Sequence, residues 1–100
     1  MVKEIVWSKR ALTERFQILE YWINRNKSSR FSEKLDNLFL QKIGLLTLHP
    51  FIGKRTTYEN IRIKIVRDYL IFYEILETQI HILSIKDGRQ NPKKFKTIRQ

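Results

Sequence analysis

The sequence predicts an α+β fold in which a helical hairpin packs on a small antiparallel sheet, in the element order β-α-α-β-β-β. Two observations support this prediction: apolar residues recur with a helical period through the first half of the chain, and with a period of two from Ile61 onward. The length of 100 residues, of which 42% are hydrophobic and 30% charged, indicates a single globular domain spanning residues 1–100. A basic segment, residues 87–100, closes the chain.

The first strand and the first helix are predicted from a change of period at Ser8. Residues Val2–Trp7 alternate between two faces, which is typical of a short strand. Ser8 then stands where an N-cap is expected, because its hydroxyl can accept a hydrogen bond from a free backbone N–H. Apolar residues follow at spacings of four, three and four. We expect the buried stripe of this helix to be Leu12, Phe16, Leu19 and Ile23, widened by Ala11, Ile18 and Trp22.

A second helix is predicted from about Ser29 to Leu48. The polar break Asn24–Ser29 is short, which favours an antiparallel hairpin of the two helices. His49-Pro50 ends the second helix, because a residue before proline avoids the helical region. We expect its buried face to comprise Phe31, Leu35, Leu38, Phe39, Ile43 and Leu46.

The remaining residues predict a loop followed by an antiparallel meander. Residues Phe51–Asn60 form the loop, and the strands are expected at Ile61–Val66, Tyr69–Glu77 and Ile80–Lys86. The connections between these strands are short, which is typical of a meander. The middle strand is apolar on both faces, as expected of a central strand. One apolar face of the sheet must pack on the hairpin, since neither layer can bury its hydrophobic side alone.

Several classes of protein are excluded by composition. The absence of cysteine excludes disulfide scaffolds, thiol catalysis, iron–sulfur clusters and thiolate zinc sites. The two histidines, His49 and His81, lie far apart, so we expect no metal site and no cofactor. No stretch approaches the ~18 apolar residues of a membrane span, and no export signal stands at the start, so we expect a cytoplasmic protein without membrane contact.

The charge points to an acidic partner. Twenty Lys and Arg residues against ten Asp and Glu residues give a net charge of +10. If the meander is correct, its basic groups can converge on one side of the sheet, where they would bind phosphates or acidic side chains. The candidates are Lys54, Arg55, Arg62, Lys64, Arg67, Arg89, Lys93 and Lys94. The alternative is a solvated basic face without a partner.

Titratable candidates for catalysis are few. His81 alternates with apolar neighbours on its predicted strand, which is typical of a packed histidine but leaves open a role as a proton acceptor. Glu59 is the carboxylate nearest to the basic loop, where it forms either a local salt bridge or the proton acceptor of a catalytic site.

These features together resemble the RelE/ParE superfamily, the toxins of type II toxin–antitoxin systems, which serve in plasmid stabilisation. Trp7-Ser8 with Ala11 fits the opening of the family, and Leu45, His49-Pro50 and Gly53 fit its passage from helix to sheet. The strand pair from Arg62 to Ile75 and the exit Asp87–Pro92 fit the end of the pattern. The resemblance implies the same β-α-α-β-β-β fold.

The branch within the superfamily decides the implied activity. ParE-like members inhibit DNA gyrase, whereas RelE-like members cut mRNA in the ribosomal A site. The RelE arginine of the central strand falls at Leu70 and its C-terminal tyrosine at about Phe95, so the ParE-like branch is favoured. In the RelE-like alternative Arg62, Lys64 and Arg89 would hold phosphates, with His81 or Glu59 as proton acceptor. A third alternative is a non-toxic basic module that binds nucleic acid.

The resemblance also implies a partner. Such toxins form complexes with an acidic antitoxin that lays an amphipathic helix and an extended segment over the toxin. We expect a hydrophobic groove between the hairpin and the sheet to receive it. The excess positive charge would speed their association.

Overall fold

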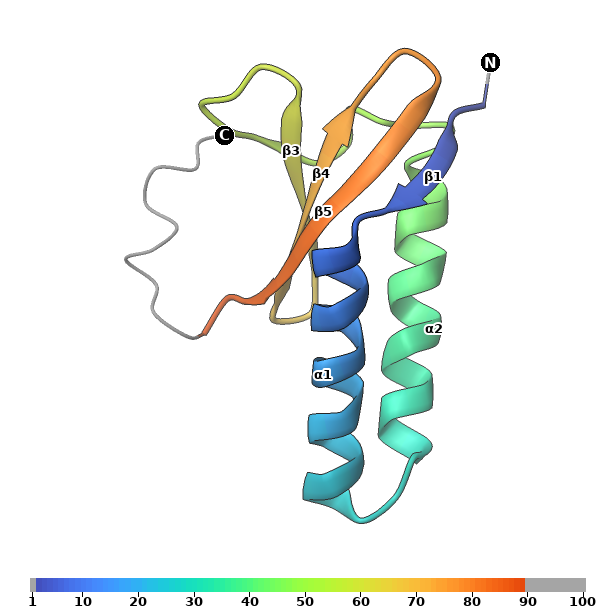
Figure 1. Ribbon diagram of the computed structural model, residues 1–100, viewed down its shortest axis with the longest axis vertical. Helices are drawn as coiled ribbons and strands as arrows, with labels where there is room; N and C mark the ends of the chain where they lie inside the picture. The colour runs from blue at the N-terminus through green and yellow to red at the C-terminus, as the bar shows by residue number, and fades with distance from the viewer. Residues whose placement is uncertain (1, 90–100) are drawn as a thin grey trace.

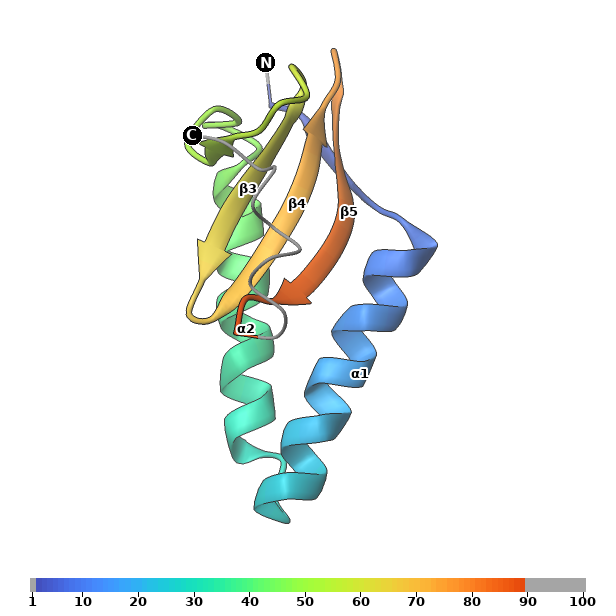
Figure 2. The same ribbon diagram turned by 90° about the vertical axis from the view of Figure 1, so that its left-hand side faces the viewer.

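A two-helix hairpin lies against a five-stranded sheet in the computed structural model, which describes residues 2–89 (Figure 1). The sheet order is β1-β5-β4-β3-β2, and in Figure 2 α2 runs behind this sheet, whose opposite face is turned to the viewer. The α+β fold predicted from the sequence is therefore confirmed. The elements are β1 (Glu4–Trp7), α1 (Lys9–Asn26), α2 (Arg30–Leu45), β2 (Lys54–Arg55), β3 (Ile61–Val66), β4 (Tyr69–Ile75) and β5 (Gln79–Asp87).

The predicted meander is confirmed, and two further pairings complete the sheet. Strands β3, β4 and β5 pair antiparallel in sequence order, and Arg67 in the β3–β4 turn has a positive φ of 55°. Strand β1 pairs parallel to β5, with Ile5 opposite Ile80. The predicted loop Phe51–Asn60 was wrong at Lys54–Arg55, because these two residues pair with β3 as the edge strand β2.

Ser8 caps α1 as predicted. Its hydroxyl accepts a hydrogen bond from the Ala11 N–H at 2.9 Å and donates to the Leu83 carbonyl of β5 at 3.0 Å. The Ser8 N–H also donates to the Ile82 carbonyl. The same residue therefore ends the β1 pairing and fixes the start of α1 against the sheet.

The buried side of α1 differs from the predicted stripe. Ala11 is fully buried, and Ile18, Leu19 and Trp22 pack against the core. By contrast Leu12, Phe16 and Ile23 are 46%, 65% and 39% exposed, so their prediction as core residues was wrong. Small Ala11 lets the helix approach the sheet along the Ala11–Ile18–Trp22 line, which turns the neighbouring stripe toward solvent.

The second helix supplies most of the helical core. Its Leu35, Phe39, Ile43 and Leu46 are buried as predicted, whereas Phe31 at its start is exposed and contacts the Trp22 ring at a centroid distance of 4.8 Å. The helix ends at Leu45, three residues earlier than expected. From the sheet, the core receives Tyr69, Ile71, Tyr73, Ile80, Ile82 and Ile85, together with Val66.

The side chains of β3 alternate between the two faces of the sheet, as predicted. Arg62 pairs with Tyr73 and Lys64 with Ile71, so both cations lie on the helix side of the sheet. The alternating Ile61, Ile63 and Ile65 lie on the face turned away from the helices. The predicted packing of one apolar face of the sheet on the hairpin is confirmed, but β4 and β5 supply most of that face. The β4 tyrosines and Ile71 determine which face meets the helices, and β3 follows their register.

Candidate functional surfaces

Arg62 is engaged within the protein and does not project freely. Its Nη1 donates to the carbonyls of Phe51 and Gly53, both at 3.0 Å, and its Cζ lies 5.0 Å from the centre of the Phe51 ring. The Nε atom is buried without a hydrogen-bond partner among the described residues. Phosphate binding by Arg62 stays a prediction, and a phosphate would compete with these carbonyls for the guanidinium.

The other basic candidates form two separate groups. Lys54, Arg55 and Lys64 lie with Arg62 on strands β2 and β3, and Arg55 stands directly opposite Arg62. Arg67 and Arg89 lie toward the other end of the sheet. At ~3.3 Å of rise per residue, about 13 Å of strand separates Arg62 from the end of β3. The structure does not bring the basic residues to one convergent site, and Lys93 and Lys94 lie outside the described residues.

Arg89 forms a local network with acidic residues. Its guanidinium pairs with Asp87 at 3.3 Å and lies 3.6 Å from Asp68 in the β3–β4 turn. The hydrogen bond to Asp87 is the main reason that the pKa of Arg89 rises above its ordinary value. Burial raises the pKa of Asp87, but hydrogen bonds from the Arg89 side chain and backbone outweigh burial and lower it. Anion binding by Arg89 remains a prediction, and it would compete with these carboxylates.

His81 and Glu59 lie on different elements. The Nε2 atom of half-buried His81 lies 2.8 Å from the Gln79 side-chain oxygen. Glu74 stands opposite His81 across the β4–β5 pair, a juxtaposition that sequence reasoning missed. Glu59 is exposed in the connection between β2 and β3. Their roles as proton acceptors remain predictions.

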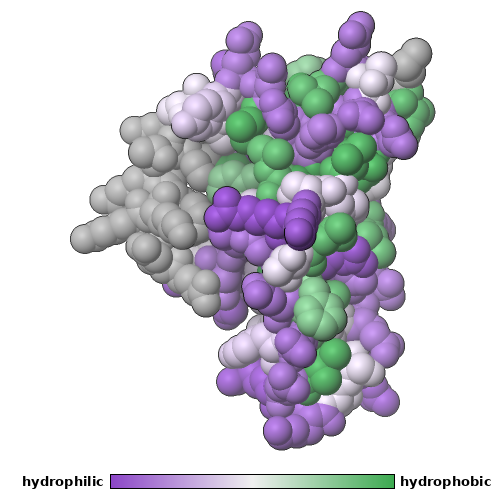
Figure 3. Space-filling view, in the orientation of Figure 1, coloured by the Kyte–Doolittle hydropathy of each residue, from purple (hydrophilic) through white to green (hydrophobic). Residues whose placement is uncertain are grey.

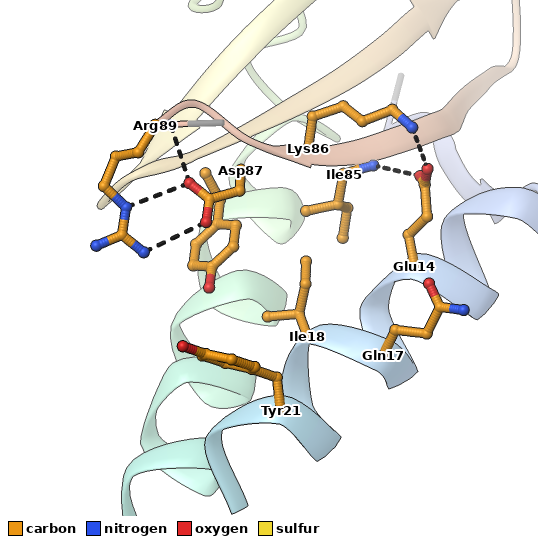
Figure 4. A pocket seen from close by; sticks show the side chains of 9 residues that line it. Glu14, Gln17, Ile18, Tyr21, Ile85, Lys86, Asp87 and Arg89 are labelled. Atoms are coloured by element: carbon orange, nitrogen blue, oxygen red, sulfur yellow. Dashed lines mark hydrogen bonds and ion pairs between the residues drawn. The ribbon is translucent and has the colours of Figure 1, made fainter. Parts of the chain in front are cut away.

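A cavity of about 380 Å³ opens between α1 and the end of β5 (Figure 4). Glu14 lines one side of the cavity, where it accepts hydrogen bonds from the Lys86 side chain, the Ser84 hydroxyl and the Ile85 N–H. Burial raises the pKa of Glu14, but these hydrogen bonds and the charge of Lys86 outweigh burial, so the net shift is downward. Beyond the last β1–β5 pair, Trp7 with Ile82, the Glu14 carboxylate thus accepts the hydrogen bond of a β5 backbone N–H that no β1 residue reaches. No local sequence signal marks this long-range role.

A hydrophobic seam runs along the outer side of the hairpin. Arg15 of α1 joins Asp36 of α2 through a bidentate ion pair at 2.7 and 2.8 Å, which raises the pKa of Arg15. Leu12, Phe16, Leu19 and Ile23 follow one another at helical spacing on α1, and Leu40 lies one turn after Asp36 on α2, so an apolar stripe runs beside this ion pair. The exposed members of this seam are Leu12, Phe16 and Ile23 from α1 and Leu40 from α2, whereas Leu19 is partly buried against the core. Hydrophobic surface over the helical half is visible in Figure 3.

The seam is an unpartnered apolar surface on a strongly basic protein. Leu40 is 43% exposed, and a Cβ placed at Gly44, one turn further along α2, would meet nothing within 4 Å. An exposed apolar stripe of this kind is typical of a protein interaction site. The groove predicted between the hairpin and the sheet corresponds in place to the cavity between α1 and β5, and the exposed seam of the helices is a second surface.

The sequence model of the ParE toxin of the type II toxin–antitoxin system parDE matches residues 5–92. The chain belongs to the ParE toxin family. Among solved structures, it is similar to the chromosomal ParDE toxin–antitoxin system from P. aeruginosa, with a TM-score of 0.74 and 12% identity over 86% of this chain and 96% of that chain. No curated protein matches the sequence significantly.

This membership confirms the predicted RelE/ParE superfamily and its favoured ParE-like branch. The protein is therefore a ParE-type toxin of a toxin–antitoxin system, with an antitoxin as partner. Neither helix described in residues 2–89 has the combination of length and hydropathy that a membrane span requires. In the same residues, no three side chains of metal-ligating type come together.

Proposed function

We propose that this ParE toxin acts in the cytoplasm, where it arrests growth by binding DNA gyrase until an acidic antitoxin covers it. The main support is the uncovered hydrophobic seam of α1 and α2. Leu12, Phe16 and Leu40 expose apolar surface to water on the helices. A contiguous exposed apolar patch is typical of a surface that a partner buries.

The antitoxin fits this seam by shape and charge. An amphipathic helix places apolar residues at helical spacing into a groove, which matches the spacing of four, three and four along α1. An acidic segment of roughly 30–40 residues could cover the seam and one sheet edge, burying the area expected of a stable complex. The net charge of +10 would accelerate the encounter with such a segment.

The engaged arginines favour action by binding over RNA cleavage. Cleavage of a phosphodiester needs cations held around the developing charge. Here Arg62 donates to backbone carbonyls and Arg89 pairs with carboxylates, at separate places on the sheet. Leu70 occupies the central strand between them and cannot supply a charge.

The antitoxin is tested with the product of the reading frame adjacent to this one. Gel filtration of the mixed proteins should show a stable complex with wild type and none, or a much weaker one, with Phe16→Asp. The matched control Thr13→Asp changes an exposed residue of the same helix by the same charge and should leave the complex intact. A complex that tolerates Phe16→Asp would contradict the seam as the binding surface.

The target is tested by inducing the protein in cells while plasmid supercoiling, DNA breakage and translation are followed in parallel. We expect supercoiling to be lost and DNA breaks to appear before translation falls. Codon-specific mRNA cuts in the ribosomal A site would instead assign the protein to the RelE-like alternative.

A further inference from the structure

The segment that follows α2 exposes large apolar side chains. Leu48, Phe51 and Ile52 are 64%, 65% and 47% exposed and lie within five consecutive residues. We call residues Leu48–Gly53 the clamped loop. In Figure 2 the loop lies near the upper end of α2 and beside β3, whereas α1 lies on the other side of the molecule. The clamped loop is thus separate from the α1 side chains of the hydrophobic seam, Phe16 among them.

Two side chains from the sheet hold this loop in one conformation. The buried Tyr73 hydroxyl donates to the Pro50 carbonyl at 2.7 Å and accepts from the Gly53 N–H at 3.0 Å. The Arg62 guanidinium donates to the Phe51 and Gly53 carbonyls. All four backbone contacts fall within Pro50–Gly53, so the loop is fixed from the protein side, while Phe51 keeps most of its surface exposed beside the Arg62 guanidinium.

Burial of the loop's own side chains does not explain why this loop is ordered. Ordering a loop costs about 1–2 kcal/mol per residue in backbone entropy, which buried apolar side chains usually offset. Here the apolar side chains of Phe51 and Ile52 remain exposed. A rigid support for exposed aromatic and aliphatic groups instead lowers the entropy lost on binding a partner.

The positive charge around the loop indicates what kind of surface its partner must present. No Asp or Glu occurs between Asp36 and Glu59, whereas Lys54 and Arg55 follow the loop directly and are exposed. A cationic rim around an apolar centre is complementary to a hydrophobic socket ringed by carboxylates. Leu48 and Ile52 are aliphatic and offer no face for base stacking, so the composition favours a protein over a nucleic acid.

We propose that the clamped loop is the surface by which this toxin binds its target protein. The target would present a hydrophobic pocket surrounded by carboxylates. Phe51 is the central anchor, Lys54 and Arg55 supply the charged rim, and Arg62 and Tyr73 are positioning residues. The inference rests on the proposed toxin function and assigns a separate surface to each partner: the clamped loop to the target and the seam to the antitoxin.

The test compares two phenylalanines of equal exposure, since Phe51 in the loop and Phe16 on the seam are both 65% exposed. With Phe51→Ala we expect purified DNA gyrase to be bound about 30-fold more weakly, the loss expected at a central interface anchor, and growth arrest to be lost. Its antitoxin complex and melting midpoint should stay as in wild type. Phe16→Ala should show the reverse: full growth arrest that the antitoxin relieves poorly. Ile52→Ala serves as a second loop variant with a smaller loss.

Each contrary outcome has a distinct meaning. If Phe51→Ala and Ile52→Ala arrest growth like wild type, the loop is not the target surface. If they lose the antitoxin but keep growth arrest, the loop belongs to the antitoxin interface and the proposal is overturned. If they lose binding to duplex DNA but not to gyrase, the partner is a nucleic acid, which also overturns it. Failure of wild type to arrest growth would refute the proposed function itself.

Discussion

Substitution of Gly53 by alanine tests how closely the clamped loop approaches the core. A Cβ at Gly53 would lie 2.5 Å from the Tyr73 hydroxyl oxygen and 2.8 Å from the Ile63 carbonyl oxygen. No glycine in residues 2–89 has a positive φ, so close approach, not backbone conformation, requires glycine here. The Ile63 carbonyl belongs to β3 and Tyr73 is fully buried, so neither can move easily.

The expected loss follows from two contributions. Overpacking costs roughly 1–3 kcal/mol, and disturbing the hydrogen bonds of a buried hydroxyl costs roughly 1–3 kcal/mol. A combined loss of about 3 kcal/mol lowers the melting midpoint of a domain this size by about 12–24 °C. Thermal unfolding followed by circular dichroism measures this shift directly.

Gly44→Ala is the matched control, because a Cβ there meets nothing within 4 Å on the exposed side of α2. It should stabilise the protein by about 0.5–1 kcal/mol, since alanine favours the helix. If Gly53→Ala melts as wild type does, the loop is not held against Tyr73 and Ile63, and the argument for a rigid binding surface fails with it.

Two further predictions concern the junction of α1 with β5. Ser8→Ala should destabilise the protein by about 1 kcal/mol through loss of the N-cap, lowering the melting midpoint by about 4–8 °C, while Thr13→Ala on the exposed face should change it little. Glu14→Gln should destabilise the protein by roughly 1.5–3 kcal/mol at pH 7, because the amide oxygen can still accept from Ser84 and Ile85 but the charge-assisted bond from Lys86 is lost. The folded pKa of Glu14 lies below the ordinary 4.5, so its stabilisation is present above that value and disappears as the pH falls through the lowered pKa. Melting of both proteins from pH 7 to pH 3 should show the gap closing, and a constant gap would contradict the ion pair.

Local patterns predicted much of the fold because they act within a few residues. The Ser8 cap, the hairpin, the end of α2 before Pro50 and the β3–β4–β5 meander all follow from residue spacing and short connections. The pairing of β1 with β5 joins segments more than seventy residues apart, for which the sequence carries no local signal. The same holds for Glu14, whose partners Ser84 and Lys86 lie equally far along the chain.

The errors on the surfaces have a common cause. The spacing of apolar residues along the sequence shows that a helix or strand has an apolar stripe. It does not show which of two adjacent stripes meets the core. On α1 the larger stripe, Leu12 to Ile23, is exposed, while the line through Ala11 packs inward. On β3 the isoleucines face away from the helices because β4 fixes the register. The misassigned stripe on α1 is a surface feature and forms the proposed antitoxin seam, whereas Ile63 on β3 is buried on the face away from the helices.

The most direct test of the account is a gyrase supercoiling assay with the purified toxin. We predict that it blocks the conversion of relaxed to supercoiled plasmid by DNA gyrase, that the acidic antitoxin restores the reaction, and that Phe51→Ala does not block it. Gyrase that works normally at toxin concentrations which arrest growth would contradict the account.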